Sequence, residues 1–288
     1  MRLPRRSWSV RYAFGMSPSP TTAAATHSFG LHALAIEAAL AGAKAIRAVY
    51  HGVPAEPNRL AVADKGGVED FVTAADLAAE EAIIATIRTA RPADRIIAEE
   101  SGVSSGSSDI RWYVDPLDGT ANLIAGKSDY AVSIAAFRLD EPVAAVIYRP
   151  ADLYWLATAS GNRLQGNLST GVNKPDSLSQ ATVSLSRPHE PARYREAMRL
   201  REALLPVVAE ERRVGSAACA LLKVATGQLD AYVSVDIPLW DTAAGHRLVE
   251  LAGGCVRIVR LTSGRPVSIA ATARLAGLLE AAIAGQTD

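Results

Sequence analysis

Apolar residues recur along the chain at the two periods that distinguish helices from strands. Over residues 31–50 they return every three or four positions, which predicts a helix that ends at Gly52 and Pro54. The same period predicts a second helix from about residue 73 to residue 90. Later helices are predicted near residues 192–208, 216–226, 242–252 and 271–284. Helices therefore occupy the start of the chain and much of its second half.

Short apolar runs bounded by turn-forming residues predict strands. They cover residues 96–98, 112–114, 131–137, 144–147, 154–157 and 183–185, and later 229–235 and 255–259. Strands thus dominate the first half, and helices alternate with strands in the second. We expect an α/β protein of two parts, with the active site at their junction. One is an α+β metal-binding domain on a largely antiparallel sheet over residues 29–180, and the other is an α/β domain over residues 181–288.

The N-terminal segment has an unusual composition. Four arginines and several serines precede the first acidic residue, as in transit peptides. The Arg5–Arg6 pair also suits a twin-arginine export signal, but Arg11 interrupts the apolar region that such a signal needs. We favour a flexible tail over residues 1–28, with Met16 as an alternative start.

Composition narrows the classes of partner and compartment. Of 288 residues, 49% are apolar, which is enough for a sizeable core. The 30 basic and 30 acidic residues cancel, which argues against a nucleic-acid polymer as partner. Cys219 and Cys255 are too few for a disulfide framework or a zinc site, so we expect a reducing cytoplasm. No apolar run approaches the roughly 20 residues of a membrane span, so we expect no membrane partner.

Acidic residues stand in four segments where a core would exclude them, at residues 69–76, 96–101, 112–120 and 239–245. In the third segment a predicted strand runs directly into Asp115, and Asp118 follows on the same tight turn. Two such carboxylates can face one point, and Mg²⁺ prefers hard oxygen ligands. Asp115 could bridge two ions, with Asp118 on one and the Leu117 carbonyl on the other. The N–H groups of Gly119 and Thr120 suit a phosphate, since Thr120 begins a short predicted helix.

Each segment alone also has an ordinary interpretation. The Asp115 segment reads as a β-turn with an Asp cap. Glu99 and Glu100 read as a solvated loop start, Asp76 as half of a capping box, and Asp241 as a helix N-cap. Four such segments in one chain favour a shared acidic site over four separate coincidences.

Three motifs in order resemble the inositol-monophosphatase superfamily. They are E-E-S at residues 99–101, D-P-L-D-G-T at residues 115–120 and W-D-T-A-A-G at residues 240–245, and the resemblance runs from about residue 31 to residue 285. It implies a layered αβαβα fold, usually a homodimer, with two or three Mg²⁺ ions and frequent inhibition by Li⁺.

The resemblance also implies roles by position. The first metal would take Glu99, Asp115 and the Leu117 carbonyl, the second would take Asp115, Asp118 and Asp241, and Glu99 would also hold a third ion. The catalytic residues would be Glu99 together with Asp76 and Thr120, which orient and deprotonate the attacking water. Lys65 matches a position near the metal loop, although a surface lysine is an equally good interpretation. We read Glu69 and Asp70 as surface or supporting charges.

The residues expected to contact the substrate match the family less closely than the expected metal ligands do. The resemblance implies that Gly119 and Thr120 cradle the phosphate, and that Gly215, Ser216, Ala217, Ser234 and Asp241 line the rest of the pocket. Ser234 lies seven residues before Asp241, where inositol-specific relatives carry a glutamate that binds ring hydroxyls. Serine is shorter and uncharged, which weakens the case for inositol, and nearby Asp236 is a candidate replacement.

These observations predict Mg²⁺-dependent hydrolysis of a small, inositol-1-phosphate-type phosphomonoester by metal-activated water, with no covalent intermediate. The segments at residues 184–187 and 240–246 are also similar to 3′(2′),5′-bisphosphate nucleotidases, and a sugar or histidinol phosphatase of the same superfamily is a further alternative. A non-catalytic regulator that binds metal or phosphate is disfavoured, because every matched catalytic position holds a competent residue.

Overall fold

The structure is a computed structural model that describes residues 22–51, 62–64, 71–188 and 190–284. Lys65, Glu69, Asp70 and most of the predicted tail lie outside these residues. The first helix, α1, spans Thr22–His51 and so includes residues 22–28, which the sequence analysis assigned to the tail. An alanine run in that stretch explains the longer helix, because alanine has the highest helix propensity.

A seven-stranded sheet forms the first half of the molecule. Its order is β4-β3-β5-β6-β7-β8-β9, and all neighbours are antiparallel except the parallel pair β3 and β5. The strands are β3 Arg95–Ala98, β4 Gly102–Val103, β5 Ile110–Asp118, β6 Ala131–Arg138, β7 Glu141–Arg149, β8 Tyr154–Ala159 and β9 Arg163–Gly166. The expectation of a largely antiparallel first sheet is confirmed.

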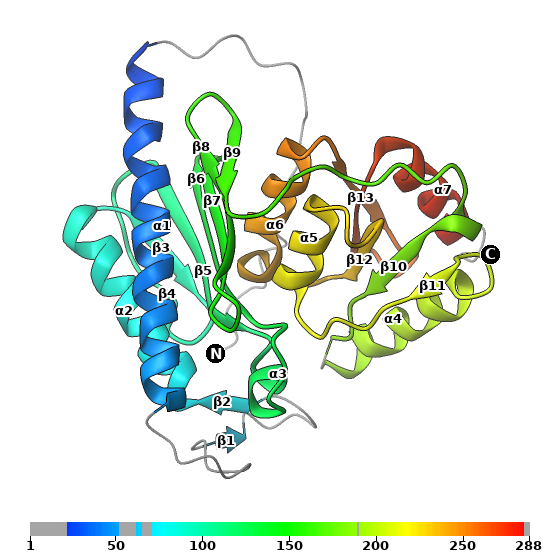
Figure 1. The fold of residues 1–288 in the computed structure, drawn as a ribbon, viewed down its shortest axis with the longest axis horizontal. Helices are drawn as coiled ribbons and strands as arrows, with labels where there is room; N and C mark the ends of the chain where they lie inside the picture. The colour runs from blue at the N-terminus through cyan, green and yellow to red at the C-terminus, as the bar shows by residue number, and fades with distance from the viewer. Residues whose placement is uncertain (1–21, 52–61, 65–70, 189, 285–288) are drawn as a thin grey trace, which may run out of the picture.

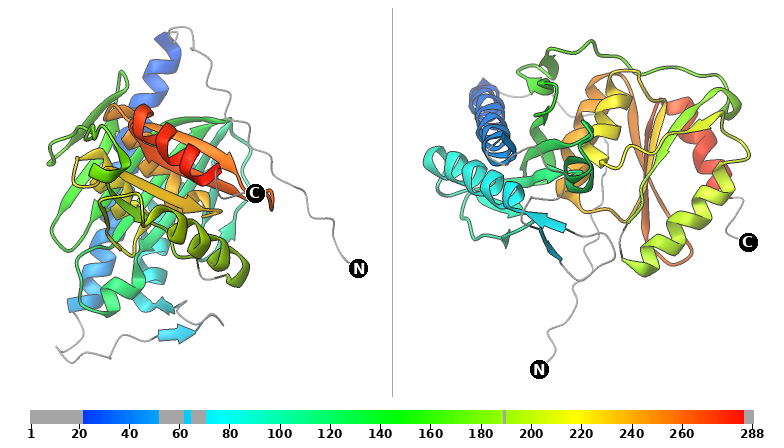
Figure 2. Two further views of the ribbon diagram at one scale, coloured as in Figure 1. Left: turned by 90° about the vertical axis from the view of Figure 1, so that its right-hand side faces the viewer. Right: turned by 60° about the horizontal axis from the view of Figure 1, so that its bottom comes forward.

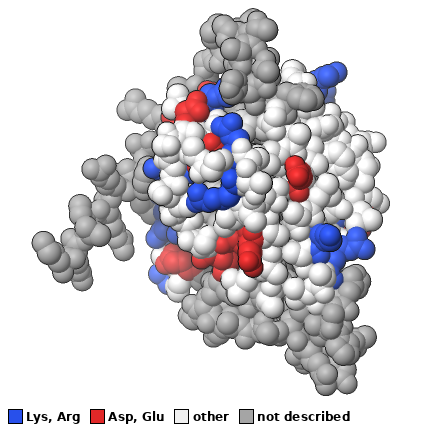
Figure 3. Space-filling view, turned by 90° about the vertical axis from the view of Figure 1, so that its left-hand side faces the viewer, with Lys and Arg blue, Asp and Glu red and all other residues white. Residues whose placement is uncertain are grey.

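Helix α1 and helix α2, Ala74–Ala90, cover one face of this sheet (Figure 1). They pack closely because α1 presents small residues such as Ala38, which is fully buried. Even a methyl group at Gly42 would come within 2.7 Å of the Ile83 side chain on α2. The outward face of these helices carries acidic and basic side chains in separate small groups (Figure 3).

A five-stranded mixed sheet forms the second half, in the order β11-β10-β12-β14-β13. Its strands are β10 Thr182–Leu185, β11 Glu210–Glu211, β12 Ala231–Val235, β13 Cys255–Arg260 and β14 Pro266–Ala271. Strand β14 was not predicted, although it lies between β12 and β13 and pairs antiparallel with both. It begins with proline and ends in alanines, residues that are depleted in strands, so propensity concealed it.

Helices separate and cover the two sheets to give five layers. Helices α5, Ala217–Ala225, and α6, Leu239–Leu251, lie between the sheets, and α4, Pro191–Leu204, and α7, Ala273–Ala284, cover the far face (Figures 1 and 2). The predicted αβαβα sandwich is therefore confirmed. None of the described helices is both long and apolar enough to span a membrane.

Three further elements lie near the lower end of the view in Figure 1. Strands β1, Val62–Asp64, and β2, Phe71–Thr73, pair antiparallel as a small separate sheet. The short helix α3, Thr120–Ile124, follows β5 and contacts β2. Residue 73 therefore ends a strand, and α2 begins one residue later than predicted.

Candidate active site

The parallel pairing of β3 and β5 places Glu99 next to Asp115. Ala98 ends β3 opposite Val114 on β5. The backbone N–H of Glu99 then donates to the Val114 carbonyl at 3.1 Å, which extends the ladder by one step. Glu99 and Asp115 therefore leave two adjacent strands at the same level, and both motifs meet at one edge of the sheet.

Asp118 enters the site through a β-bulge and not through the tight turn that the sequence predicted. Strand β5 was expected to end at residue 114, but it continues to Asp118. Its pairing with β6 shifts register between Asp115 and Asp118, and Pro116 lies inside the irregularity, where a missing N–H group is tolerated. The Leu117 N–H donates to Asp115 Oδ1 at 3.0 Å. The bulge thus brings both carboxylates of the motif to one region.

A hydrogen bond between a strand and a helix brings Asp241 to the same region. Ser133 lies opposite Asp115 in the sheet, and its hydroxyl donates to the Trp240 carbonyl at 3.2 Å. Asp241 is the next residue, in the first turn of α6. The N-cap of this helix is Pro238, so Asp241 does not hold the cap position that its ordinary interpretation assumed.

Helix α5 holds the Asp118 carboxylate. The Ser216 hydroxyl donates to Asp118 Oδ2 at 2.7 Å, and the Ala218 N–H donates to the same oxygen at 2.5 Å. Ser216 is also the N-cap of α5, since its hydroxyl accepts the Cys219 N–H at 3.0 Å. The Gly215–Ala217 segment, which was predicted to line the pocket, therefore lies beside Asp118.

Asp76 and Thr120 are in direct contact. The Thr120 hydroxyl lies 2.9 Å from Asp76 Oδ1 and 3.0 Å from the Leu117 carbonyl. Asp76 is in the first turn of α2 and is only 1% exposed. The structure thus brings together the two residues predicted to orient the attacking water, across 44 positions of sequence.

The carboxylates influence one another's ionisation. Burial raises the pKa of Asp115 well above its usual value, and the charges of Glu99, Asp118 and Asp241 raise it further. Burial together with Asp118 and Glu99 likewise raises the pKa of Asp241, although Arg193 opposes this shift. Burial raises the pKa of Asp118 to about 6, despite the hydrogen bonds from α5. The side chains around the cluster therefore do not supply enough positive charge to bring the pKa values of these carboxylates back to their usual range.

The residues present fit a hard divalent cation. Among the residues that the structure describes, no group of three or more Asp, Glu, His or Cys side chains has the geometry to hold a metal ion as it stands. The acidic cluster of Glu99, Asp115, Asp118 and Asp241 is centred on Asp115, which is 1% exposed, and its carboxylates repel one another when ionised. Its donors are all oxygens, which suits Mg²⁺, and a bound cation would relieve the repulsion.

Comparison with sequence models of protein families shows which family this chain belongs to. The model described as the inositol monophosphatase family matches residues 31–285, which is most of the chain. The chain belongs to the inositol monophosphatase family. This family is one of phosphatases that generally use Mg²⁺.

Individual relatives agree with this assignment. The chain is 38% identical over 191 residues to the Nus factor SuhB of Pasteurella multocida (strain Pm70), covering 65% of this chain and 71% of that protein. Its fold is similar to the crystal structure of extragenic suppressor protein SuhB from Bartonella henselae, with a TM-score of 0.78, 30% identity, and coverage of 88% of this chain and 98% of that one. The inositol monophosphatase from Anabaena (Nostoc) sp. PCC 7120 gives a TM-score of 0.75 at 28% identity, covering 89% and 96%.

Asn122, which lies one place beyond the position where many relatives carry Asn and to which the sequence analysis assigned no site role, links α3 to the segment before Gly215. Its side-chain amide donates to the Asp129 carbonyl at 2.6 Å and to the Val214 carbonyl at 2.9 Å. Gly119 packs on the same Asp129 carbonyl, which would lie 2.8 Å from an added Cβ, and its φ is +94°. The Asn122 side chain is only 7% exposed, and this burial of an amide is apparent from the structure and not from the sequence.

Ser234 takes a position that differs from a simple substrate contact. It is 2% exposed, and its hydroxyl lies 2.6 Å from that of Ser268 on β14. Asp236, with a φ of +49°, instead lies near the start of α6 and forms ion pairs with Arg193 at 3.2 Å and Arg265 at 3.1 Å. The contact of Ser234 with substrate stays a prediction.

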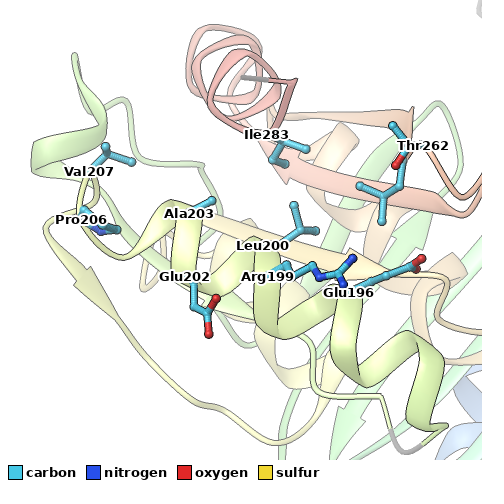
Figure 4. Close-up of a pocket in the computed structure, with 10 residues that line it drawn as sticks. Glu196, Arg199, Leu200, Glu202, Ala203, Pro206, Val207, Thr262 and Ile283 are labelled. Carbon is cyan, nitrogen blue, oxygen red and sulfur yellow. The ribbon is translucent and has the colours of Figure 1, made fainter. Parts of the chain in front are cut away.

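A cavity of about 540 Å³ lies elsewhere, between α4 and α7 (Figure 4). None of the predicted site residues lines it. Its lining residues are Glu196, Arg199, Leu200, Glu202, Ala203, Pro206, Val207, Leu261, Thr262 and Ile283. The acidic cluster and this cavity therefore lie in separate parts of the molecule.

Proposed function

We propose that this protein is a Mg²⁺-dependent phosphatase that hydrolyses a small phosphomonoester of the inositol-1-phosphate type. The observation that carries the proposal is the meeting of Glu99, Asp115, Asp118 and Asp241 at one edge of the first sheet, beside the Asp76–Thr120 pair. Uncatalysed hydrolysis of phosphate monoesters is extremely slow, so the site has to supply a nucleophile and neutralise phosphoryl charge.

Five groups of this chain are proposed to hold the metal: the carboxylates of Glu99, Asp115, Asp118 and Asp241, and the Leu117 carbonyl. Bound Mg²⁺ would acidify a water molecule and neutralise charge on the phosphoryl oxygens. Because hard oxygen donors are matched by hard cations, Mg²⁺ is the expected metal. Two or three ions are proposed, as the resemblance to the family implies.

Asp76 and Thr120 are proposed to manage the proton of the attacking water. The Thr120 hydroxyl has one proton, and donating it to Asp76 Oδ1 leaves an oxygen lone pair that can accept from water. Asp76 is then the base at the end of this short relay. The backbone N–H groups of Gly119 and Thr120 are proposed to bind the phosphate, so no covalent enzyme intermediate is needed.

A second candidate is another phosphomonoester of the same superfamily. It is a nucleoside 3′(2′),5′-bisphosphate or a sugar bisphosphate, both of which carry a second anionic group, or it is histidinol phosphate. It is supported by Ser234, whose hydroxyl is paired with Ser268 and which carries no carboxylate for ring hydroxyls. For the two bisphosphates it is also supported by Arg193, whose positive charge partly opposes the rise in the pKa of Asp241 that burial, Asp118 and Glu99 cause. An arginine whose charge acts on the acidic cluster is suited to attracting a second negative group of the substrate.

A phosphate-release assay across these substrates tests the proposal. Purified protein with Mg²⁺ is expected to hydrolyse at least one of inositol-1-phosphate, adenosine 3′,5′-bisphosphate, a sugar bisphosphate and histidinol phosphate. Asp115→Asn should remove this activity, whereas Asp109→Asn should not, since Asp109 is an exposed carboxylate paired with Arg138. Near-normal turnover by the Asp115 variant would contradict the metal role.

A non-catalytic role is a further alternative, because the relative from Pasteurella multocida carries the name of a Nus factor. The same assay tests this alternative. Protein that binds Mg²⁺ and hydrolyses none of the panel would favour a regulator. Millimolar Li⁺ inhibition would support the phosphatase.

The remaining proposals concern assembly and location. We propose a cytoplasmic homodimer with a small-molecule phosphomonoester as its partner and with neither nucleic-acid polymer nor membrane bound. Light scattering after size-exclusion chromatography measures the dimer, and a monomer at micromolar concentration would contradict it.

A further inference from the structure

We propose that Glu80 is a positioning residue that holds Glu99 in its metal-binding orientation, an inference that rests on the proposed function. The two carboxylate oxygens of Glu80 each accept one backbone N–H group from the segment that follows β3. Glu80 Oε2 accepts from Glu100 at 2.8 Å, and Glu80 Oε1 accepts from Ser101, also at 2.8 Å.

The position of Glu80 on α2 suits this role. It lies four residues after Asp76, and residues at this spacing share one face of a helix. Both side chains are buried, at 1% exposure for Asp76 and 4% for Glu80. Asp76 contacts Thr120, and Glu80 contacts the Glu100–Ser101 backbone, so one helix face supports two segments of the site.

The hydrogen bonds of Glu80 restrict the backbone on one side of Glu99. The N–H of Glu100 belongs to the peptide group that follows Glu99, so holding it limits the ψ angle of Glu99. The N–H of Glu99 itself is held by the Val114 carbonyl at 3.1 Å, which limits the backbone on the other side. With both flanking peptide groups held, the direction of the Cα–Cβ bond is set, and with it the region that the carboxylate can reach.

This arrangement resembles the outer shell of a metal site. Residues that orient metal ligands through hydrogen bonds typically change metal affinity or activity by about 10- to 100-fold when removed. A carboxylate is needed because a glutamine presents only one acceptor oxygen, and its amide nitrogen would face the second N–H group. The test is therefore Glu80→Gln, with Glu81→Gln as the matched control, since Glu81 is the adjacent acid on α2 and is exposed.

The dissociation constant of Mg²⁺ is measured by titration calorimetry for the full chain and both variants, with Glu99→Gln as a benchmark. Circular dichroism checks the fold. Glu80→Gln is expected to weaken Mg²⁺ binding about tenfold or more, and Glu81→Gln to leave it within about twofold. At saturating Mg²⁺ the KM for substrate should stay near that of the unmodified protein, because Glu80 acts through the metal ligand.

Two outcomes separate this inference from the proposed function. If Glu99→Gln loses Mg²⁺ affinity but Glu80→Gln binds like the unmodified protein, the role of Glu80 is overturned and the phosphatase proposal stands. If the unmodified protein binds Mg²⁺ without hydrolysing any phosphomonoester, the phosphatase proposal fails, and the calorimetric comparison still decides Glu80. Should Glu80→Gln not fold, Glu80→Asp decides, because its shorter side chain keeps the charge but withdraws both acceptor oxygens.

Discussion

The Ser216 hydroxyl donates a 2.7 Å hydrogen bond to Asp118, across 98 positions of sequence. The same hydroxyl accepts the Cys219 N–H and so caps helix α5. One side chain therefore joins a proposed metal ligand at the end of β5 to the start of a helix that lies between the two sheets. The relative position of two site segments depends on this link.

Ser216→Ala should lower both stability and activity. Loss of an N-cap typically costs about 1 kcal/mol, and the partly buried Asp118 carboxylate also loses a donor. We expect the melting temperature to fall by about 2–4 °C. We also expect kcat to fall, by more than a small decrease in the fraction of folded protein would cause. Ser216→Thr keeps a hydroxyl that can both donate and accept, so it should restore most of both quantities. An alanine variant with unchanged kcat would show that the link does not matter for turnover.

Gly119→Ala should be far more damaging than Gly126→Ala. Both glycines have positive φ, +94° and +68°, so both substitutions carry a similar backbone penalty of about 1 kcal/mol. The added methyl group at Gly119 would lie 2.8 Å from the Asp129 carbonyl, whereas that at Gly126 meets nothing within 4 Å. Comparing melting temperatures and kcat isolates the clash, and equal effects of the two variants would argue against it.

The sequence predicted most helices and strands because their apolar periods are strong and uninterrupted. It could not predict β14, whose small residues and leading proline carry little strand signal, although burial between two neighbours stabilises the strand. It also missed the β-bulge at Pro116, because a proline after a short apolar run is equally typical of a turn. The pairing of β5 with β6, a tertiary effect, selects the bulge over the turn.

The candidate ligands were predictable from motifs, but the residues that support them were not. Glu80, Asn122 and Ser133 contact backbone groups 20, 92 and 107 positions away, and any backbone N–H or C=O looks the same in a sequence. Burial of a polar side chain is the physical mark of such residues, and it emerges only from the packed structure. The convergence of the acidic segments followed from spacing and resemblance, and the ladder of β3 with β5 supplies its physical cause.

Asn122→Asp should lower kcat by more than any decrease in the amount of folded protein explains. The variant keeps the shape of the side chain but replaces the amide donor, which contacts two carbonyl oxygens at 2.6 and 2.9 Å, with a carboxylate. We expect kcat to fall by about 10-fold or more, since α3 and the Val214 segment lose their connection. Asn173→Asp is the control, because this exposed amide also donates to a carbonyl, that of Gly227 at 2.6 Å. Similar kcat values for both variants would contradict the prediction.

Asp94 is expected to contribute stability that depends on pH. Burial raises the pKa of Asp94, but hydrogen bonds from Arg91, Ser108 and Trp112 outweigh burial and leave this pKa lowered. A lowered pKa means that the folded state binds its proton less tightly than the unfolded state. The contribution is therefore full above the unfolded pKa of about 4 and is lost as pH falls below it.

Asp94→Asn removes this contribution and leaves Arg91 without its partner at 2.8 Å. Breaking a buried ion pair typically costs about 3–5 kcal/mol, and we expect a loss near the lower end at pH 7, since Arg91 is partly exposed. Urea unfolding at several pH values measures it. Asp109→Asn should cost less than about 1 kcal/mol, because its pair with Arg138 is more exposed. A deficit of Asp94→Asn that did not shrink in acid would contradict the assignment.

Asp118 should show the opposite dependence on pH when no metal is added. Burial raises the pKa of Asp118 to about 6, so the folded state binds this proton more tightly than the unfolded state. Stability from this group is present below the unfolded pKa of about 4 and declines as pH rises through about 6. In chelator, the melting temperature of the unmodified protein should therefore fall relative to Asp118→Asn between about pH 4 and pH 6.5. Excess Mg²⁺ should reverse the trend for the unmodified protein alone, because a cation that binds only the folded, deprotonated cluster stabilises it by mass action. A difference in melting temperature that is independent of both pH and Mg²⁺ would mean that Asp118 neither holds its proton in this range nor binds the metal.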